Sequence, residues 1–124
     1  KDFGRDNRGK AENTEGSRIL KELVVTEDDY IIIKKRFSGF FRTNLEELLQ
    51  KLKVDTVIIC GVNTQAFVRT TAIDAYQRDY NVILATDCVN AFDEEFHRVS
   101  LRYLSRSIAA LKTNRDIFRD ENCN

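Results

Sequence analysis

Continuous apolar runs and helical periodicity alternate along this 124-residue chain. Three runs place β-branched residues between polar or charged ends, which is typical of strands buried on both faces: 29–35 (DYIIIKK), 54–60 (VDTVIIC) and 80–88 (YNVILATDC). Between the runs, apolar residues recur at the spacing of amphipathic helices. Because strands that alternate with helices need crossover connections, the pattern predicts an α/β fold with a parallel sheet and helices on its faces.

Helices are expected over three stretches: 43–52, 64–79 and 93–111. The first begins with Thr43 and Glu46 at the spacing of a capping box. The third begins with Asp93 and two glutamates, whose negative charge suits the start of a helix. We expect residues 1–16 to be an irregular polar segment and residues 112–124 to be a weakly determined tail. The whole chain has the length of one domain.

The composition argues against several classes of partner. Twenty basic residues balance 20 acidic ones, so no overall field draws the chain to nucleic acid or to a membrane surface. No apolar run approaches the ~20 residues that span a bilayer, and the start has no signal-peptide pattern. The chain begins with Lys1 rather than methionine, as a fragment would. We expect neither a nucleic-acid partner nor a membrane.

Three widely spaced cysteines, one histidine and no CxxC pair do not suit a disulfide framework or a zinc site. Cys60 and Cys88 end apolar runs, where a free cysteine usually behaves as a small buried hydrophobe. His97 is interpreted as a surface or capping residue. We therefore expect a cytoplasmic protein without a metal or cofactor, and an unreactive Cys60.

Ligands of parallel α/β proteins bind outside the carboxyl ends of the strands, which directs attention to Lys34, the turn Gly61–Thr64 and Asp87. Each has an ordinary structural alternative: a solvated strand end for Lys34, a turn or capping residue for Asn63, and a cap for Asp87. The helix after the turn presents Phe67 in its first turn, and an aromatic residue there is most often part of the core. The pattern alone leaves these alternatives open.

Two segments of the sequence resemble motifs of a known protein family. The segment "IIIKKRFSGFFRTNLEELL" is similar to the K-x-R-[YF]-S-[AG]-F…T-x-L segment of the isochorismatase-like hydrolases. The segment "CGVNTQAFVRTTAIDAYQRDYNVILATD" resembles their G-V-x-T-x-x-C-V-x-x-T-A…D segment, and "NTEGSRILKEL" resembles the lead-in. The match runs in order from about Thr14 to Leu104. It implies a three-layer α/β/α sandwich with a parallel sheet, lacking the family's first strand.

The resemblance also implies an Asp–Lys–Cys site. The family's lysine corresponds to Lys34, its cysteine position is occupied by Phe67, and its aspartate lies on a first strand that this chain does not contain. A thiolate is the nucleophile in such chemistry, and a benzyl side chain cannot form a thioester, so cysteine amidase chemistry is excluded for this polypeptide. The family's turn further implies a cis peptide and an oxyanion role at Val62–Asn63.

The function implied is that of an isochorismatase-family hydrolase, amidase-type on a small amide or carbamoyl substrate in its active form and inactive as written. Two alternatives remain: vinyl-ether hydrolysis of the isochorismatase type, which does not need the cysteine, and a noncatalytic binding or assembly role. A small-molecule substrate is expected. The nicotinamidase branch holds its metal through an Asp-x-His cluster that this chain lacks. Without the first strand a sheet edge is left unpaired, so we expect either a longer parent chain that supplies the missing segment or a partner subunit that covers the edge in a homo-oligomer.

Overall fold

The computed structural model describes residues 18–121, so the expectation for residues 1–16 lies outside the described residues. The chain forms two compact units, Lys1–Ile31 and Ile32–Asn124, and each is considered by itself. In the described part of the first unit the backbone follows turns, one of which is closed by hydrogen bonds from Thr26 N and Thr26 Oγ1 to Asp29 Oδ2 at 2.7 and 3.1 Å. The prediction of a single domain stays a prediction.

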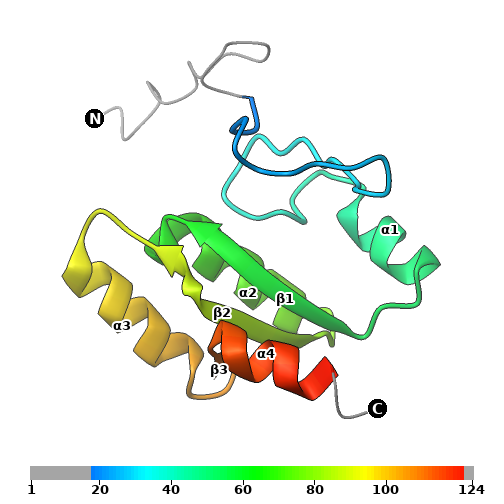
Figure 1. The fold of residues 1–124 in the computed structure, drawn as a ribbon. Coiled ribbons are helices and arrows are strands. Elements are labelled where there is room, and N and C mark those ends of the chain that lie inside the picture. Colours follow the sequence, from blue (N-terminus) through cyan, green and yellow to red (C-terminus); the bar gives the residue numbers. More distant parts are fainter. Residues whose placement is uncertain (1–17, 122–124) are drawn as a thin grey trace, which may run out of the picture. The chain divides into compact units, whose positions relative to one another are not determined.

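The second unit contains all the described helices and strands. In chain order they are α1 (Leu45–Lys51), β1 (Thr56–Val62), the π-helical turn η3 (Thr64–Val68), α2 (Arg69–Tyr76), β2 (Asn81–Asn90), α3 (Glu94–Leu104), β3 (Ala110–Lys112) and α4 (Asn114–Glu121). The strands form one parallel sheet in the order β1-β2-β3. Figure 1 shows α2 behind this sheet and α4 in front of it. The predicted α/β class with a parallel sheet is confirmed.

Two of the three expected strands are present. The run 54–60 corresponds to β1 and the run 80–88 to β2, which pair in register with Ile58 beside Ile83. The strand expected over 29–35 is wrong, because this segment forms no strand and Ile33 is 76% exposed. An apolar run predicts burial, but a strand also needs hydrogen bonds to a neighbouring strand, and this segment pairs with none within the described residues.

The helix expected over 64–79 begins as the π-helical turn η3 and ends at Tyr76. The start of the next helix is confirmed: the Asp93 side chain caps α3 by accepting a hydrogen bond from Phe96 N at 2.9 Å. That helix stops at Leu104 rather than near residue 111, because the Leu104 carbonyl accepts the N–H groups of Ile108 and Ala109. The chain then turns into β3.

The expected tail beyond residue 111 is also wrong, since β3 ends at Lys112 and α4 follows. Thr113 and Asp116 cap α4 reciprocally: Asp116 N donates to Thr113 Oγ1 at 3.2 Å, and Thr113 Oγ1 donates to Asp116 Oδ2 at 2.8 Å. Asp87, which lies within β2 two residues beyond the last β2 residue that pairs with β3, accepts a hydrogen bond from Asn114 N at 2.8 Å. The structural alternative for Asp87, a cap, is the role that the geometry supports.

The capping box predicted at the start of α1 does not form. Thr43 Oγ1 accepts a hydrogen bond from Leu45 N at 3.3 Å, whereas Glu46 turns away and pairs with Arg78 Nε at 3.0 Å. This ion pair links α1 to the end of α2. The core between α2 and the sheet is closely packed because Ala72 and Ala75 are fully buried and let the helix approach the strands.

Candidate functional site

The turn between β1 and α2 is closed by a single carbonyl group. Asn63 O accepts hydrogen bonds from Ala66 N and Phe67 N at 3.1 Å and from Val68 N at 3.4 Å. Gly61 permits the approach to this turn because its φ of +136° lies in a region that residues with a side chain rarely adopt. The N–H of Phe67 is therefore occupied inside the turn and is not free to bind an oxyanion.

The cis peptide expected at Val62–Asn63 is wrong, since every peptide bond in the described part of the chain is trans. A cis bond before a residue other than proline costs about 3 kcal/mol, and here the turn closes without it through the Asn63 carbonyl. The expected oxyanion role of Val62 and Asn63 stays a prediction.

Lys34 and Phe67 lie in direct contact. Lys34 Nζ is 4.3 Å from the centroid of the Phe67 ring, which is the geometry of a cation–π interaction. Phe37 contacts the same ring edge-to-face, with the centroids 5.2 Å apart and an interplanar angle of 87°. Lys34 Nζ also donates a hydrogen bond to Arg36 O at 3.0 Å. Desolvation by its surroundings lowers the pKa of Lys34 below its ordinary value.

The loop that carries Lys34 is anchored on α2 although it is not a strand. Gly39 N donates a hydrogen bond to Thr71 Oγ1 at 3.0 Å. Phe40 is buried, stacks on Tyr80 with a centroid distance of 6.1 Å, and lies beneath the Arg78 guanidinium at 4.9 Å. Because these contacts fix the chain a few residues after Lys34, they hold its ammonium group near Phe67.

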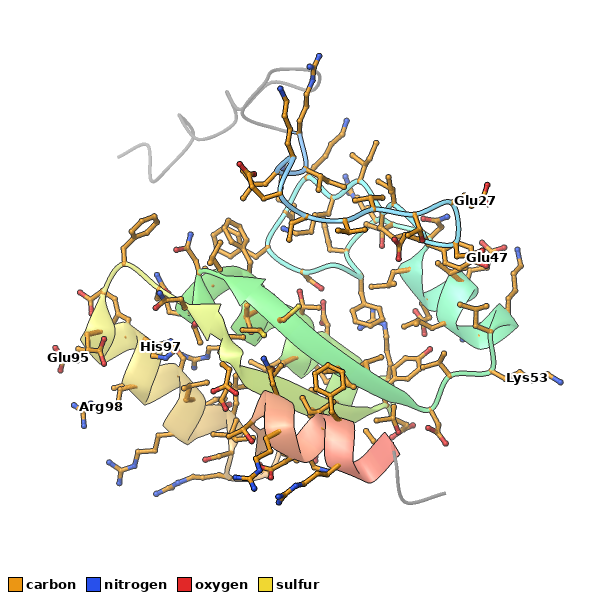
Figure 2. All side chains as sticks on the ribbon, in the orientation of Figure 1. Glu27, Glu47, Lys53, Glu95, His97 and Arg98 are labelled. Atoms are coloured by element: carbon orange, nitrogen blue, oxygen red, sulfur yellow. The ribbon has the colours of Figure 1, made fainter. Side chains whose placement is uncertain are left out.

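His97 belongs to this site, although the sequence was interpreted otherwise. Thr64 Oγ1 and His97 Nδ1 are 2.8 Å apart, and Thr64 is fully buried. The hydrogen bond connects the start of η3 to α3, and in Figure 2 the His97 side chain points from α3 toward the strands. One signal in the sequence could have shown this: His97 precedes Leu101 and Leu104 by four and seven positions and therefore shares their buried helix face.

Two more polar groups of the turn are buried. Asn63 Oδ1 and Gln65 Oε1 have no hydrogen-bond partner among the described residues. A buried acceptor without a partner costs about 1–3 kcal/mol, so both oxygens are positions where a donor from a ligand or a water would be stabilising. Together with Lys34, the turn offers one cation, two amide side chains and an aromatic surface.

Residues 2–116 match the Isochorismatase domain family. The chain belongs to the isochorismatase family. Over 90 residues it is 41% identical to an Arabidopsis thaliana protein named "Probable inactive nicotinamidase". The matched residues make up 71% of this chain and 46% of that protein. The chain spans about half the length of the curated relatives that it matches.

Solved structures of the isochorismatase family agree with this assignment. An isochorismatase-like hydrolase from Alkaliphilus metalliredigens has a TM-score of 0.85 and 36% identity, over 89% of this chain and 60% of that one. The N-carbamoylsarcosine amidase from Thermoplasma acidophilum has a TM-score of 0.75 and 33% identity, over 82% of this chain and 58% of that one. The resemblance drawn from the two motifs is thus confirmed.

In the described part of the chain, two cysteines are the other groups that chemistry could use. Cys60 and Cys88 are free and exposed, so the expectation of a buried Cys60 is wrong; alternation along β1 turns its side chain outward. Within residues 18–121, no cluster of three histidine, cysteine or acidic side chains could hold a metal ion. Over the same residues, no helix has the length and apolar character needed to cross a bilayer.

An apolar cavity of about 360 Å³ lies elsewhere in the second unit. Its lining comes from α1, β1 and the anchored loop, with Thr71 of α2: Phe40, Leu45, Leu49, Val54, Thr56, Val57, Ile58, Ile59 and Thr71. Neither Lys34 nor Phe67 lines it. The phenyl ring of Phe67 instead lies directly beneath the Lys34 ammonium group.

Proposed function

We propose that this chain carries the substrate-binding part of an isochorismatase-family hydrolase site and does not itself perform cysteine amidase chemistry. The substrate class is a small amide or carbamoyl compound, hydrolysed by forms that carry the nucleophile and the aspartate. The observation that supports the proposal is the contact between Lys34 Nζ and the Phe67 ring at 4.3 Å, because the motifs align these residues with the family's lysine and cysteine.

The chemistry of the nucleophile is the reason why we expect no amidase activity from this chain. An amidase of this type attacks the carbonyl carbon with a thiolate and forms a thioester, which water then hydrolyses. A nearby ammonium group lowers the pKa of such a thiol and keeps it ionised. Lys34 supplies the ammonium group, but Phe67 offers it only the face of a benzene ring.

The same arrangement supports binding. An ammonium group has three N–H donors, and Lys34 uses one of them for Arg36 O among the described residues. The donors that remain suit a carbonyl or carboxylate oxygen of a small planar molecule, whose ring or amide plane would stack on one of the two perpendicular rings of Phe37 and Phe67.

The free donors of Lys34 also favour a second candidate, hydrolysis of a vinyl ether of the isochorismatase type. That reaction needs charge and proton transfer but no thiol, so Phe67 does not exclude it chemically. The bulk of the Phe67 ring opposes this candidate, because the ring occupies the space beside the Lys34 ammonium group in which a substrate would bind.

A two-by-two experiment separates these possibilities. The chain as written and Phe67→Cys are each assayed with and without a preceding segment that carries the family's acidic strand, on nicotinamide, N-carbamoylsarcosine and isochorismate. Phe67→Ser is the matched control, since it removes the ring and adds no thiol. Binding of the same compounds is measured by calorimetry, with Lys34→Met as the binding control.

We expect binding without turnover in the chain as written, and amide hydrolysis only where both the thiol and the aspartate are present. Ammonia release from the chain as written would overturn the proposal. Turnover of isochorismate with Phe67 in place would establish the second candidate. If the doubly restored form hydrolyses none of the compounds, position 67 is not the nucleophile site.

A further inference from the structure

Helix α3 has two apolar faces, and only one of them is covered. The covered face packs toward η3 and α2 through His97, Ser100, Leu101 and Leu104. The other face carries three large side chains, Phe96, Val99 and Tyr103, which are 58%, 48% and 47% exposed. Phe92, two residues before the first residue of the helix, is 98% exposed. We refer to Phe92, Phe96, Val99 and Tyr103 as the α3 stripe.

The spacing of the α3 stripe makes it continuous. Within the helix Phe96, Val99 and Tyr103 follow one another at intervals of three and four residues, which is the interval of side chains that share one face of a helix. Tyr103 is also held in place, because the Arg69 guanidinium lies 4.5 Å from the centre of its ring. A contiguous exposed apolar surface of this kind marks an interaction site more often than a solvated surface.

The charges beside the α3 stripe change sign along the helix. Glu94 and Glu95 lie in the first turn, whereas Arg98 and Arg102 follow in the second half. Figure 2 shows Glu95 and Arg98 pointing away from the sheet. In the part of the chain that the structure describes, neither Glu95 nor Arg102 takes part in an ion pair. At 100° per residue, both residues flank the stripe on the same side.

We propose that the α3 stripe binds the α3 stripe of a second copy of this chain, with the two helices antiparallel. In that arrangement a two-fold axis passes near Val99, and residues that lie on one flank of one helix meet the same flank of the other. Glu95 of each copy then lies beside Arg102 of the other. Two symmetric ion pairs border an apolar seam of two Val99, two Phe96 and two Tyr103 side chains.

The alternation of charge is the reason for choosing a second copy as the partner. A uniformly acidic or basic partner would attract one half of α3 and repel the other, whereas an antiparallel α3 complements both halves at once. The open edge of β1 is the competing surface, since Thr56–Val62 contains no charged residue and, among the strands of residues 18–121, pairs with β2 alone. It therefore supplies the control variant.

Sedimentation equilibrium of the full chain tests the proposal. We expect a reversible dimer, and Val99→Asp should weaken it at least a hundredfold because the change occurs twice at the centre of the seam. Glu95→Arg or Arg102→Glu alone should raise the Kd about tenfold, since each converts two attractions into two repulsions. The double variant Glu95→Arg with Arg102→Glu should recover the original Kd to within about threefold. Ile58→Lys, on the edge strand β1, should leave the Kd unchanged.

The exchange of charges between positions 95 and 102 tests the antiparallel dimer even if Val99→Asp fails to fold, because substitutions of exposed charged residues rarely affect folding. Far-ultraviolet circular dichroism of each variant checks the fold. A double variant weaker than both single variants would overturn the antiparallel pairing. So would a chain that stays monomeric at all concentrations, or a dimer that Ile58→Lys abolishes and Val99→Asp does not.

Discussion

Replacing Phe67 with cysteine creates a thiol whose ionisation reports on Lys34. The Lys34 ammonium nitrogen is 4.3 Å from the centre of the ring that is removed. At that separation two unit charges interact by about 1 kcal/mol in water and about 4 kcal/mol at an effective dielectric constant of about 20. One pKa unit corresponds to about 1.36 kcal/mol, so the ammonium group lowers the thiol pKa by about 0.7 to 3 units.

The low end of this range is expected. Lys34 is exposed, so solvent screens its charge. The N–H at position 67 is already bonded to Asn63 O, so the turn itself contributes little to stabilising the thiolate. We therefore expect the new thiol to have a pKa about one unit below the ordinary value of about 8.5.

The assay is the pH profile of alkylation by iodoacetamide, followed for each cysteine by peptide mass spectrometry. Cys60 and Cys88 are free and exposed, and they serve as internal references in the same molecule. The second variant, Phe67→Cys with Lys34→Met, removes the ammonium group and should return the pKa of the new thiol to about 8.5. If the new thiol had the same pKa in both variants, Lys34 would not be the group that lowers the pKa of a thiol at position 67.

Two further predictions concern the stability of the turn. Gly61→Ala should lower the free energy of unfolding by about 1–3 kcal/mol through backbone strain, because a φ of +136° is unfavourable for alanine while its Cβ would meet only Val68 Cγ2 at 3.8 Å; a urea midpoint equal to that of the unaltered chain would contradict this. Thr64→Val should cost about 1–3 kcal/mol by leaving His97 Nδ1 without its partner. In the double-mutant cycle with His97→Leu, the double variant should lose about 0.5–1.5 kcal/mol less free energy of unfolding than the sum of the two single losses. Equal values would show that the hydrogen bond does not stabilise the protein.

The sequence by itself determined the elements whose signals are local. The runs that became β1 and β2 combine β-branched residues with polar ends, and the alternation with helices required a parallel sheet. Asp93 marked the start of α3 because a cap acts within three residues of itself. The motifs that carry Lys34 and Phe67 paired these two positions, and the structure brings the two side chains into contact.

The tertiary structure decided whatever depends on a distant partner. Residues 29–35 contain a continuous apolar run as β1 does, yet they form no strand, since the hydrogen bonds of a strand come from another segment. β3 has only three residues and is a strand because β2 lies beside it, with Leu84 opposite Leu111. His97 joined the site because α3 turns it toward Thr64. Local propensity cannot encode these outcomes, because each depends on which groups from other parts of the chain are in reach.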